Sequence, residues 1–190
     1  LEVPSGQAGS HREKNWGILA AAVETARQTG QSVVLAVNSD TQREELLNHL
    51  IPEFQQKLAA LEAGSGEPGA KKRLKAGNEP FKVSVVKNQT NYLCLRRWES
   101  LRKTNSLTDD ELKLLIKVLV WLPGTTTGDS SELRIGSSER LWSRINSQKG
   151  LCTPELCNQA GRPRCFFYRA RERAKHSHIV VADQALVLAD

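Results

Sequence analysis

The sequence lacks methionine, long apolar runs and any secretion signal. Because no methionine is present, residue 1 is not a natural start, and we interpret the chain as a piece of a longer protein. The longest apolar runs, such as "IVVA" and "LVLA", are far shorter than the roughly 18 residues that a membrane-spanning helix needs. No basic head followed by an apolar core opens the chain. We therefore expect a cytoplasmic protein that has no membrane partner.

Acidic residues are in the minority. The chain has 21 Asp and Glu against 27 Lys and Arg, which gives a net charge of +6. The excess is concentrated in "KKRLK" (71–75), "RRWESLRK" (96–103) and "RPRCFFYRARERAK" (162–175). A basic excess favours a polyanionic partner, and it equally serves solubility. Two of the three basic stretches flank cysteines, so charge and cysteines point to the same part of the chain.

Apolar periodicity predicts alternating strands and helices near the N-terminus. Residues 1–10 are predicted to form a short strand and a Gly/Ser loop, and residues 31–40 a strand buried on both faces. Residues 15–30 and 41–64 are predicted helices, the second interrupted near Pro52. Strand, helix, strand, helix implies a parallel sheet with helices on its faces, so the fold class is α/β.

The composition of the chain changes after this region. Residues 63–80 are rich in Gly, Pro and Lys and predict a flexible surface loop. Residues 93–165 show only helix and loop patterns, which we interpret as an insertion between strands. The surrounding predictions are a strand at 81–86, helices at 106–122 and 137–146, a helix at 166–176, a strand at 177–183 and a short helix at 184–190.

The helix at 106–122 has the most detailed prediction. Thr108 and Glu111 have the spacing of an N-terminal capping box. Leu112, Leu115, Ile116 and Leu119 recur at helical spacing and are expected to mark its apolar face. The resulting domain prediction is a first α/β segment at 1–92, a lobe at 93–165 and a return segment at 166–190.

The four cysteines follow the pattern C-x57-C-x4-C-x7-C, formed by Cys94, Cys152, Cys157 and Cys165. A chain of this length without a secretion signal belongs in a reducing compartment, where clustered cysteines bind metal or perform redox chemistry. One four-thiolate site could clamp an inserted lobe to its entry point. Four thiolates suit structural zinc or an iron–sulfur cluster, although the paired C-x2–4-C spacing of zinc sites is not followed. Four unrelated buried cysteines are the remaining alternative.

Several stretches resemble one known family. "VVKNQTNYLC" resembles the K-G-R-x-N-Y-L-C entry to the iron–sulfur domain of bacterial DinG-type helicases, relatives of the XPD helicases in superfamily 2. "VLVWLPGTTTGDSSEL" is similar to the family's W-x-x-x-T-x-T-G-D-x-x-E-L stretch. "CFFYRARERAKHSHIVVADQALVLAD" resembles C-F-Y-x-R-A-R-x-x-A-x-x-A-x-I-V-V-x-N-H-A-L-L-L-x-D. The matches follow the family's order over most of the chain.

This resemblance implies a fold, a function and a set of sites. The fold is a partial RecA-like P-loop parallel sheet with an inserted all-helical iron–sulfur lobe, in which Cys94, Cys152, Cys157 and Cys165 ligate a [4Fe–4S] cluster. The parent would be an ATP-dependent 5′–3′ DNA helicase acting on single-stranded or forked DNA, and we expect a monomer. Phosphates attract cations, and bases stack on rings or guanidinium planes. The predicted DNA contacts, each of which could instead be a solvated or core residue, are Asn38, Ser39, Lys87, Tyr92, Arg96, Arg97, Arg164 and Arg169.

The nucleotide loop departs from the family pattern E-A-x-T-G-x-G-K-[ST]. Ser5, Gly6 and Ser10 match it, but Gly9 stands where the lysine should meet the β- and γ-phosphates. The predicted nucleotide-binding set is Ser5, Gly6, Gly9 and Ser10, with ATP and Mg²⁺ as cofactors of the parent. Loss of the lysine weakens the case for hydrolysis.

Other motor motifs have changed as well. Asn38 and Asp40 occupy places where the family has threonines, and Asp183-Gln184 replaces Asn-His. Asp40 would repel a phosphate unless it caps the following helix. The D-E-A-H box, which the family carries further downstream, is absent, so this chain alone should not hydrolyse ATP. Two alternatives stay open: a helicase-like DNA-binding protein without ATPase activity, and a zinc-stapled structural module.

Overall fold

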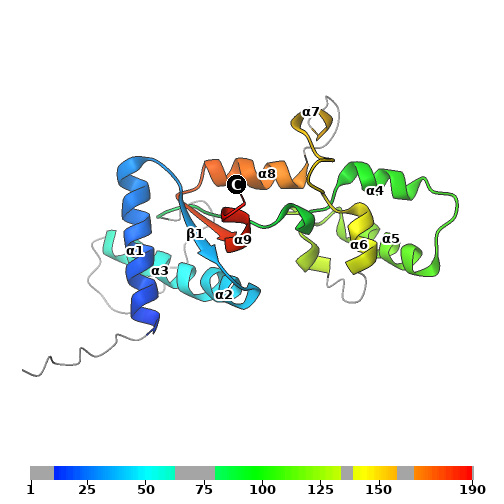
Figure 1. The fold of residues 1–190 in the computed structure, drawn as a ribbon. Coiled ribbons are helices and arrows are strands. Elements are labelled where there is room, and N and C mark those ends of the chain that lie inside the picture. The colour runs from blue at the N-terminus through cyan, green and yellow to red at the C-terminus, as the bar shows by residue number, and fades with distance from the viewer. Residues whose placement is uncertain (1–10, 63–79, 134–138, 158–164, 190) are drawn as a thin grey trace, which may run out of the picture. The chain divides into compact units, whose positions relative to one another are not determined.

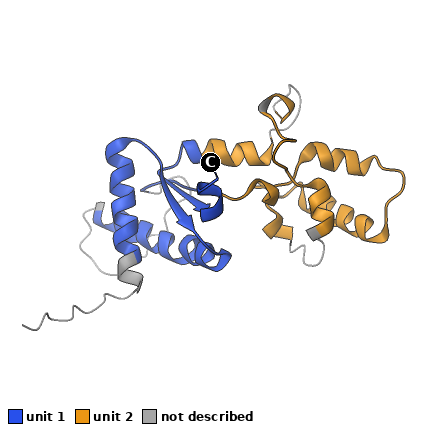
Figure 2. Ribbon diagram, viewed as in Figure 1, with its two compact units in different colours: residues 1–85, 174–190 blue, residues 86–173 orange. Residues whose placement is uncertain are grey.

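The computed structural model describes residues 11–62, 80–133, 139–157 and 165–189. The predicted first strand and nucleotide loop (1–10), nearly all of the predicted surface loop (63–79) and Arg164 lie outside the described residues. The chain divides into two compact units (Figure 2): unit 1 comprises residues 1–85 and 174–190, and unit 2 comprises residues 86–173. Unit 2 therefore extends beyond the predicted lobe, 93–165, at both ends.

Unit 1 is an α/β unit built on a small sheet (Figure 1). The strands are β1 (Val33–Val37), β2 (Val83–Val86, whose last residue opens unit 2) and β3 (Ile179–Asp183), in the order β1-β3-β2. β1 and β3 are parallel, in a register that runs from Val33 opposite Ile179 to Val37 opposite Asp183. The helices are α1 (His11–Thr29), α2 (Asp40–Glu45), α3 (Ile51–Glu62) and α9 (Gln184–Val187). The predicted α/β class is confirmed for this unit.

The core of unit 1 lies between α1, the α2–α3 region and the central strand. Leu19 and Val23 of α1 pack in one cluster with Phe81 and with Ile179 and Val181 of β3. The alanine-rich sequence of α1 favours a helix, and Gly30 ends it with a φ of 67°, a left-handed conformation that glycine adopts without strain. β3 is buried along nearly its whole length, as the apolar run predicts.

The prediction that β1 is buried on both faces is wrong for the described residues. Burial alternates along β1, and Val34 is 48% exposed. β1 lies at one edge of the described sheet. The alternating burial shows that, in the described part of the chain, one of its faces is left uncovered. An apolar run alone does not say whether both faces are covered.

The predicted interruption near Pro52 is confirmed. α2 and α3 are joined by a π-helical turn at Leu46–Leu50, directly before Ile51 and Pro52. Proline has no N–H to donate and its ring crowds the preceding turn, so a wider turn relieves the strain without ending the helix. None of the described helices has the length and apolar character required to cross a membrane.

In its described residues, unit 2 consists of helices and turns with two isolated β-bridges, Tyr92 to Asp129 and Leu93 to Asn146. Its α-helices are α4 (Leu95–Arg102), α5 (Asp109–Trp121), α6 (Glu139–Ile145), α7 (Pro154–Cys157) and most of α8 (Phe166–Lys175). Short 3-10 turns lie at Gln89–Asn91 and Ser130–Leu133. α4 and α7 are elements that the patterns did not predict individually.

The capping box of α5 is confirmed. Its predicted apolar face is confirmed only at Leu115, which packs against the core of unit 2, whereas Leu112, Ile116 and Leu119 are exposed. The Glu111 N–H donates to Thr108 Oγ1 at 3.3 Å, and the Glu111 carboxylate accepts the Thr108 N–H at 2.8 Å. The buried face carries Leu114 and Val118, whereas Ile116 is 53% exposed. Apolar residues occupy almost every position from 112 to 120, so spacing alone offers two overlapping stripes. The core around Trp98 and its neighbours selects the stripe that packs.

Candidate metal and nucleic-acid site

Cys94 lies where two segments far apart in sequence pair. Leu93 and Asn146 form an antiparallel bridge. On one side of it the Cys94 N–H donates to the Ile145 carbonyl at 2.8 Å, and on the other the Ser147 N–H donates to the Tyr92 carbonyl at 2.8 Å. This short ladder brings the first cysteine beside the segment that leads to Cys152.

Two arginines that follow Cys94 hold the same segment. Arg96 donates from Nη2 to the Leu151 carbonyl at 2.8 Å, and Leu151 directly precedes Cys152. Arg97 donates from Nη1 to the Asn146 carbonyl at 2.9 Å. Arg96 remains exposed and Arg97 half-buried. Both therefore contribute to the fold around the cysteines, and their contact with DNA stays a prediction.

All four cysteines are free thiols of unit 2, Cys94 and Cys165 buried and Cys152 and Cys157 partly exposed. Burial raises the pKa of Cys94, while the backbone N–H of Arg97 lowers it. Burial, followed by the charges of Cys165 and Cys152, raises the pKa of Cys157 to about 12. The thiols are thus close enough to influence one another's ionisation.

The four cysteines suit a thiolate-ligated metal in their chemistry. Soft thiolate donors favour zinc or iron–sulfur clusters over Mg²⁺ or Ca²⁺. Within the described residues, however, no three His, Cys, Asp or Glu side chains are gathered closely enough to hold a metal ion. The donor type fits an iron–sulfur cluster, and binding one would have to draw the thiols closer together.

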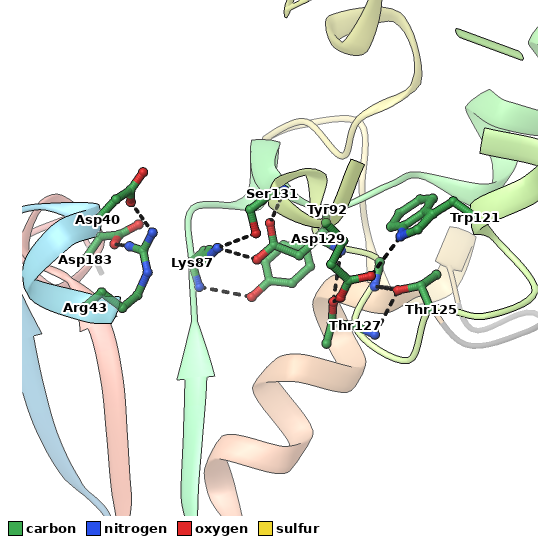
Figure 3. Close-up of polar contacts among 12 residues, drawn as sticks. Asp40, Arg43, Lys87, Tyr92, Trp121, Thr125, Thr127, Asp129, Ser131 and Asp183 are labelled. Carbon is green, nitrogen blue, oxygen red and sulfur yellow. Dashed lines mark hydrogen bonds and ion pairs between the residues drawn. The ribbon is translucent and has the colours of Figure 1, made fainter. Parts of the chain in front are cut away.

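Lys87 and Tyr92, both predicted DNA contacts, are held inside unit 2 (Figure 3). Lys87 Nζ lies 2.5 Å from Asp129 Oδ2 and 3.1 Å from Ser131 Oγ, and the Lys87 and Asp129 side chains are each 12% exposed. The Lys87 backbone N–H donates to the Tyr92 hydroxyl oxygen at 3.0 Å, and Tyr92 is only 3% exposed. In the described structure both residues organise the entry to unit 2, and their contact with DNA stays untested.

The turn at 125–129 contacts the segment through which the chain enters unit 2. Gly128 has a φ of 68°, its carbonyl accepts the Leu93 N–H at 2.9 Å, and its own N–H donates to Thr125 Oγ1 at 2.9 Å. Arg169, another predicted DNA contact, donates to the Thr126 carbonyl at 3.2 Å, and its guanidinium lies 5.3 Å from the centre of the Phe166 ring. The threonine- and glycine-rich turn at 125–129 therefore holds the backbone at Leu93 in place.

Asn38 and Ser39, the predicted DNA contacts of unit 1, are exposed at the start of α2. Ser39 is the N-cap, since its Oγ accepts the Gln42 N–H at 3.2 Å. The Asn38 N–H donates to Gln42 Oε1 at 3.0 Å. The alternative in which Asp40 caps this helix is wrong, because Asp40 is the first helical residue and its carboxylate is directed to Arg43.

Arg43 is a buried residue that sequence reasoning missed (Figure 3). Its side chain is 8% exposed and forms ion pairs with Asp40 and Asp183, which follow or end the neighbouring strands β1 and β3. Both carboxylates depart from the family pattern, and their shared partner Arg43 accounts for both. The sequence signal that could have predicted this ion pair is two unexpected acidic residues at strand ends, with an arginine three residues after the first.

Comparison with known proteins gives distant relatives. No family model matches the chain. The 3'-5' exonuclease DinG of Bacillus subtilis is 24% identical, with 100% of this chain and 18% of that protein aligned. The ATP-dependent DNA helicase YoaA of Haemophilus influenzae is 25% identical over 97% of this chain and 25% of the relative. The ATP-dependent helicase DinG of Mycobacterium tuberculosis is 24% identical over 100% of this chain and 33% of the relative.

These alignments cover the chain almost from end to end, so they do not rest on one short motif. The chain spans a third or less of the length of each of these curated relatives. The chain is a distant homologue, over its full length, of part of the DinG and YoaA ATP-dependent DNA helicases.

Proposed function

We propose that the chain forms part of the first, RecA-like motor domain of a DinG-like 5′–3′ DNA helicase. In this proposal the parent is cytoplasmic and uses ATP and Mg²⁺, and the chain binds single-stranded or forked DNA. Unit 2 supplies the main DNA surface and binds a [4Fe–4S] cluster through Cys94, Cys152, Cys157 and Cys165. The homology supports the class of protein.

The separation of charge between the units is the observation that carries the DNA-binding part. Unit 2 contains 16 Lys and Arg against nine Asp and Glu, whereas unit 1 contains 11 against 12. The whole positive excess of the chain therefore lies in the unit that holds the four cysteines. Solubility does not require positive charge to be concentrated in one unit. A cluster of Lys and Arg does favour binding to a phosphate backbone, because its positive charge attracts the phosphates and releases their counterions.

The arrangement around Cys94 supports the metal-binding part. The ladder to Ile145 and the arginine contacts to Leu151 and Asn146 already join the first cysteine to the segment of the second. When bound, the cluster would cross-link these segments with Cys157 and Cys165 and provide a redox-active centre. The residues of the chain would orient the thiols and exclude water from Cys94, which is 4% exposed.

A helicase-like DNA-binding protein without ATPase activity is the second candidate. It is favoured by Gly9, which stands in place of the lysine that contacts the β- and γ-phosphates. Both candidates bind DNA through unit 2, and they differ in ATP-driven unwinding by the parent. ATP-driven unwinding by the wild-type parent separates them: unwinding that requires ATP supports the helicase, whereas DNA binding without ATP-driven unwinding supports the second candidate.

The first experiment measures iron and acid-labile sulfide in the anaerobically purified chain. About four iron and four sulfide per chain are expected for a four-cysteine cluster. One zinc without sulfide would instead favour the zinc-stapled structural module and would contradict the cluster.

The DNA surface is tested with Arg96→Ala against Arg102→Ala. Both residues lie on α4, and Arg102 is exposed and paired with Glu99 at 3.1 Å. We expect Arg96→Ala to weaken binding to single-stranded DNA and to reduce the slope of log K against log salt by about 0.7, one phosphate contact. Because Arg96 also contacts Leu151, the metal content of both variants is measured. Equal losses in the two variants would show that overall charge, rather than Arg96, binds the DNA.

A further inference from the structure

Three buried polar side-chain atoms in the described residues have no hydrogen-bond partner: Trp16 Nε1, Trp98 Nε1 and Ser147 Oγ. Trp16 belongs to unit 1. The other two belong to unit 2, and their backbone N–H groups donate to the carbonyls of Cys94 (Trp98) and Tyr92 (Ser147). Buried polar groups are nearly always paired, so two unpaired groups on residues joined to this segment need an explanation.

Ser147 is placed beside Cys94 by the short ladder. Leu93 and Asn146 are opposite one another, which makes Tyr92 the partner of Ser147 and Cys94 the partner of Ile145. Side chains alternate along such a ladder, so Cys94 and Ser147 lie on the same face as diagonal neighbours. The Ser147 side chain is completely buried, at 0% exposure, and its hydroxyl is aimed at no protein acceptor.

Trp98 lies one helical turn after the same cysteine and is joined to it through the backbone. Cys94 is the N-cap of α4, and the Trp98 N–H donates to the Cys94 carbonyl at 2.9 Å. Residues four apart lie on one face of a helix. Trp98 is 1% exposed, and its indole N–H can only donate.

We propose that Ser147, assisted by Trp98, donates a hydrogen bond to metal-bound sulfur at Cys94. This inference rests on the proposed metal site and adds two positioning residues to it. Both groups are donors, and a metal-bound thiolate or sulfide is an acceptor that needs donors. A charge-assisted bond to such sulfur would satisfy groups that the protein alone leaves unpaired. Binding of the metal would thereby complete the hydrogen bonding of this core.

The test uses the full 190-residue chain, metal-free and loaded with iron and sulfide, and compares Ser147→Ala with Ser143→Ala. Ser143 is exposed on α6, and its hydroxyl donates to the Arg140 carbonyl at 2.7 Å. We expect Ser147→Ala to raise the melting temperature of the metal-free chain, because an unpaired buried hydroxyl is removed. In the loaded chain it should lower the melting temperature and shift the reduction potential to more negative values, since donors to sulfur stabilise the reduced cluster. Ser143→Ala should shift both forms alike.

Other outcomes decide the matter. An equal change in both forms, with an unchanged potential, overturns the role of Ser147 while leaving the cluster in place. A fall in the melting temperature of the metal-free chain also overturns it, because the hydroxyl then has a partner without metal. If the chain binds Co²⁺ or Zn²⁺ but no sulfide, the proposed iron–sulfur cluster is wrong. Ser147 is still supported if Ser147→Ala raises the melting temperature of the metal-free chain and lowers that of the Co²⁺-loaded chain. A chain that binds none of these overturns both proposals.

Trp98→Phe is the second variant, because it removes the N–H and keeps most of the ring. Like Ser147→Ala, it should raise the melting temperature of the metal-free chain and lower that of the loaded chain. A variant that destabilises both forms equally would show that Trp98 acts only through packing.

Discussion

Among the described glycines of unit 2, Gly128 leaves the least room for a side chain. It has a positive φ of 68°, and a Cβ built on it would lie 2.2 Å from Cγ of Phe166. Gly150 also has a positive φ, 84°, but a Cβ there would meet nothing within 4 Å. The two glycines therefore separate the cost of the backbone conformation from the cost of the collision.

Gly128→Ala should destabilise unit 2 by about 3 kcal/mol, the sum of a left-handed residue and an overpacked ring. Gly150→Ala should cost only about 1 kcal/mol, because the backbone term acts alone. Denaturant unfolding followed by tryptophan fluorescence measures the two values; Trp98 and Trp142, both buried in unit 2, contribute to this signal together with Trp16 and Trp121. Equal losses would mean that the Phe166 ring moves aside at little cost.

Charged residues show why some sites escape sequence reasoning. Lys87 follows a strand and precedes a cysteine, which is a reasonable position for a phosphate contact, yet it pairs with Asp129 inside the fold. Arg43 is 140 residues from Asp183 in the sequence. Local spacing reports neither partner, because the fold alone brings such residues together. By contrast, the Thr108–Glu111 box is local and could be predicted fully.

At the scale of elements, local patterns located most helices and strands but assigned three exposed residues, Leu112, Ile116 and Leu119, to the apolar face of α5. The cap, the length and the apolar content of α5 are all encoded within its own sequence. The choice between the Leu114–Val118 stripe and the Leu112–Ile116 stripe is made by neighbours such as Trp98 and Trp142. A strand such as β1 fails in the same way, since its apolar run does not tell which faces other elements cover.

Leu114→Ala and Leu112→Ala test this choice with identical chemistry on one helix. Leu114 is 3% exposed, and its truncation should cost about 3 kcal/mol through lost contacts and a cavity. Leu112 is 48% exposed, and its truncation should cost less than about 1 kcal/mol. Thermal or chemical unfolding of both variants is sufficient, and a larger loss for Leu112 would contradict the observed face.

At the scale of the whole molecule, the chain divides into two compact units. The positive charge and the four cysteines belong to unit 2, and the sheet belongs to unit 1. The family resemblance, whose motifs are long and ordered, predicts an inserted lobe at 93–165, and these bounds stay a prediction. The distances between the four thiols could not be predicted in the same way, since they depend on how residues 94 to 165 pack.

Cys152→Ser should remove the metal clamp from unit 2 without disrupting the sheet. In limited proteolysis of the loaded chain, we expect the wild type to be cut first within 63–80. The variant should be cut first within 93–165, as should metal-free wild-type protein. Cleavage of the loaded variant that remained confined to 63–80 would disprove the clamp.

The position of unit 2 between two neighbouring strands has a kinetic consequence. β2 and β3 are adjacent in the sheet, but the chain between them passes through all of unit 2. Pairing these strands closes a loop of about 90 residues, and loop-closure entropy makes this about 2 kcal/mol costlier than closing a loop of about eight. If unit 2 folds first and holds its two ends near each other, the entropy cost of pairing β2 with β3 would be close to that of the shorter loop. The sheet should then assemble faster when the inserted unit is already folded. A metal that stabilises unit 2 would thereby increase the folding rate of unit 1.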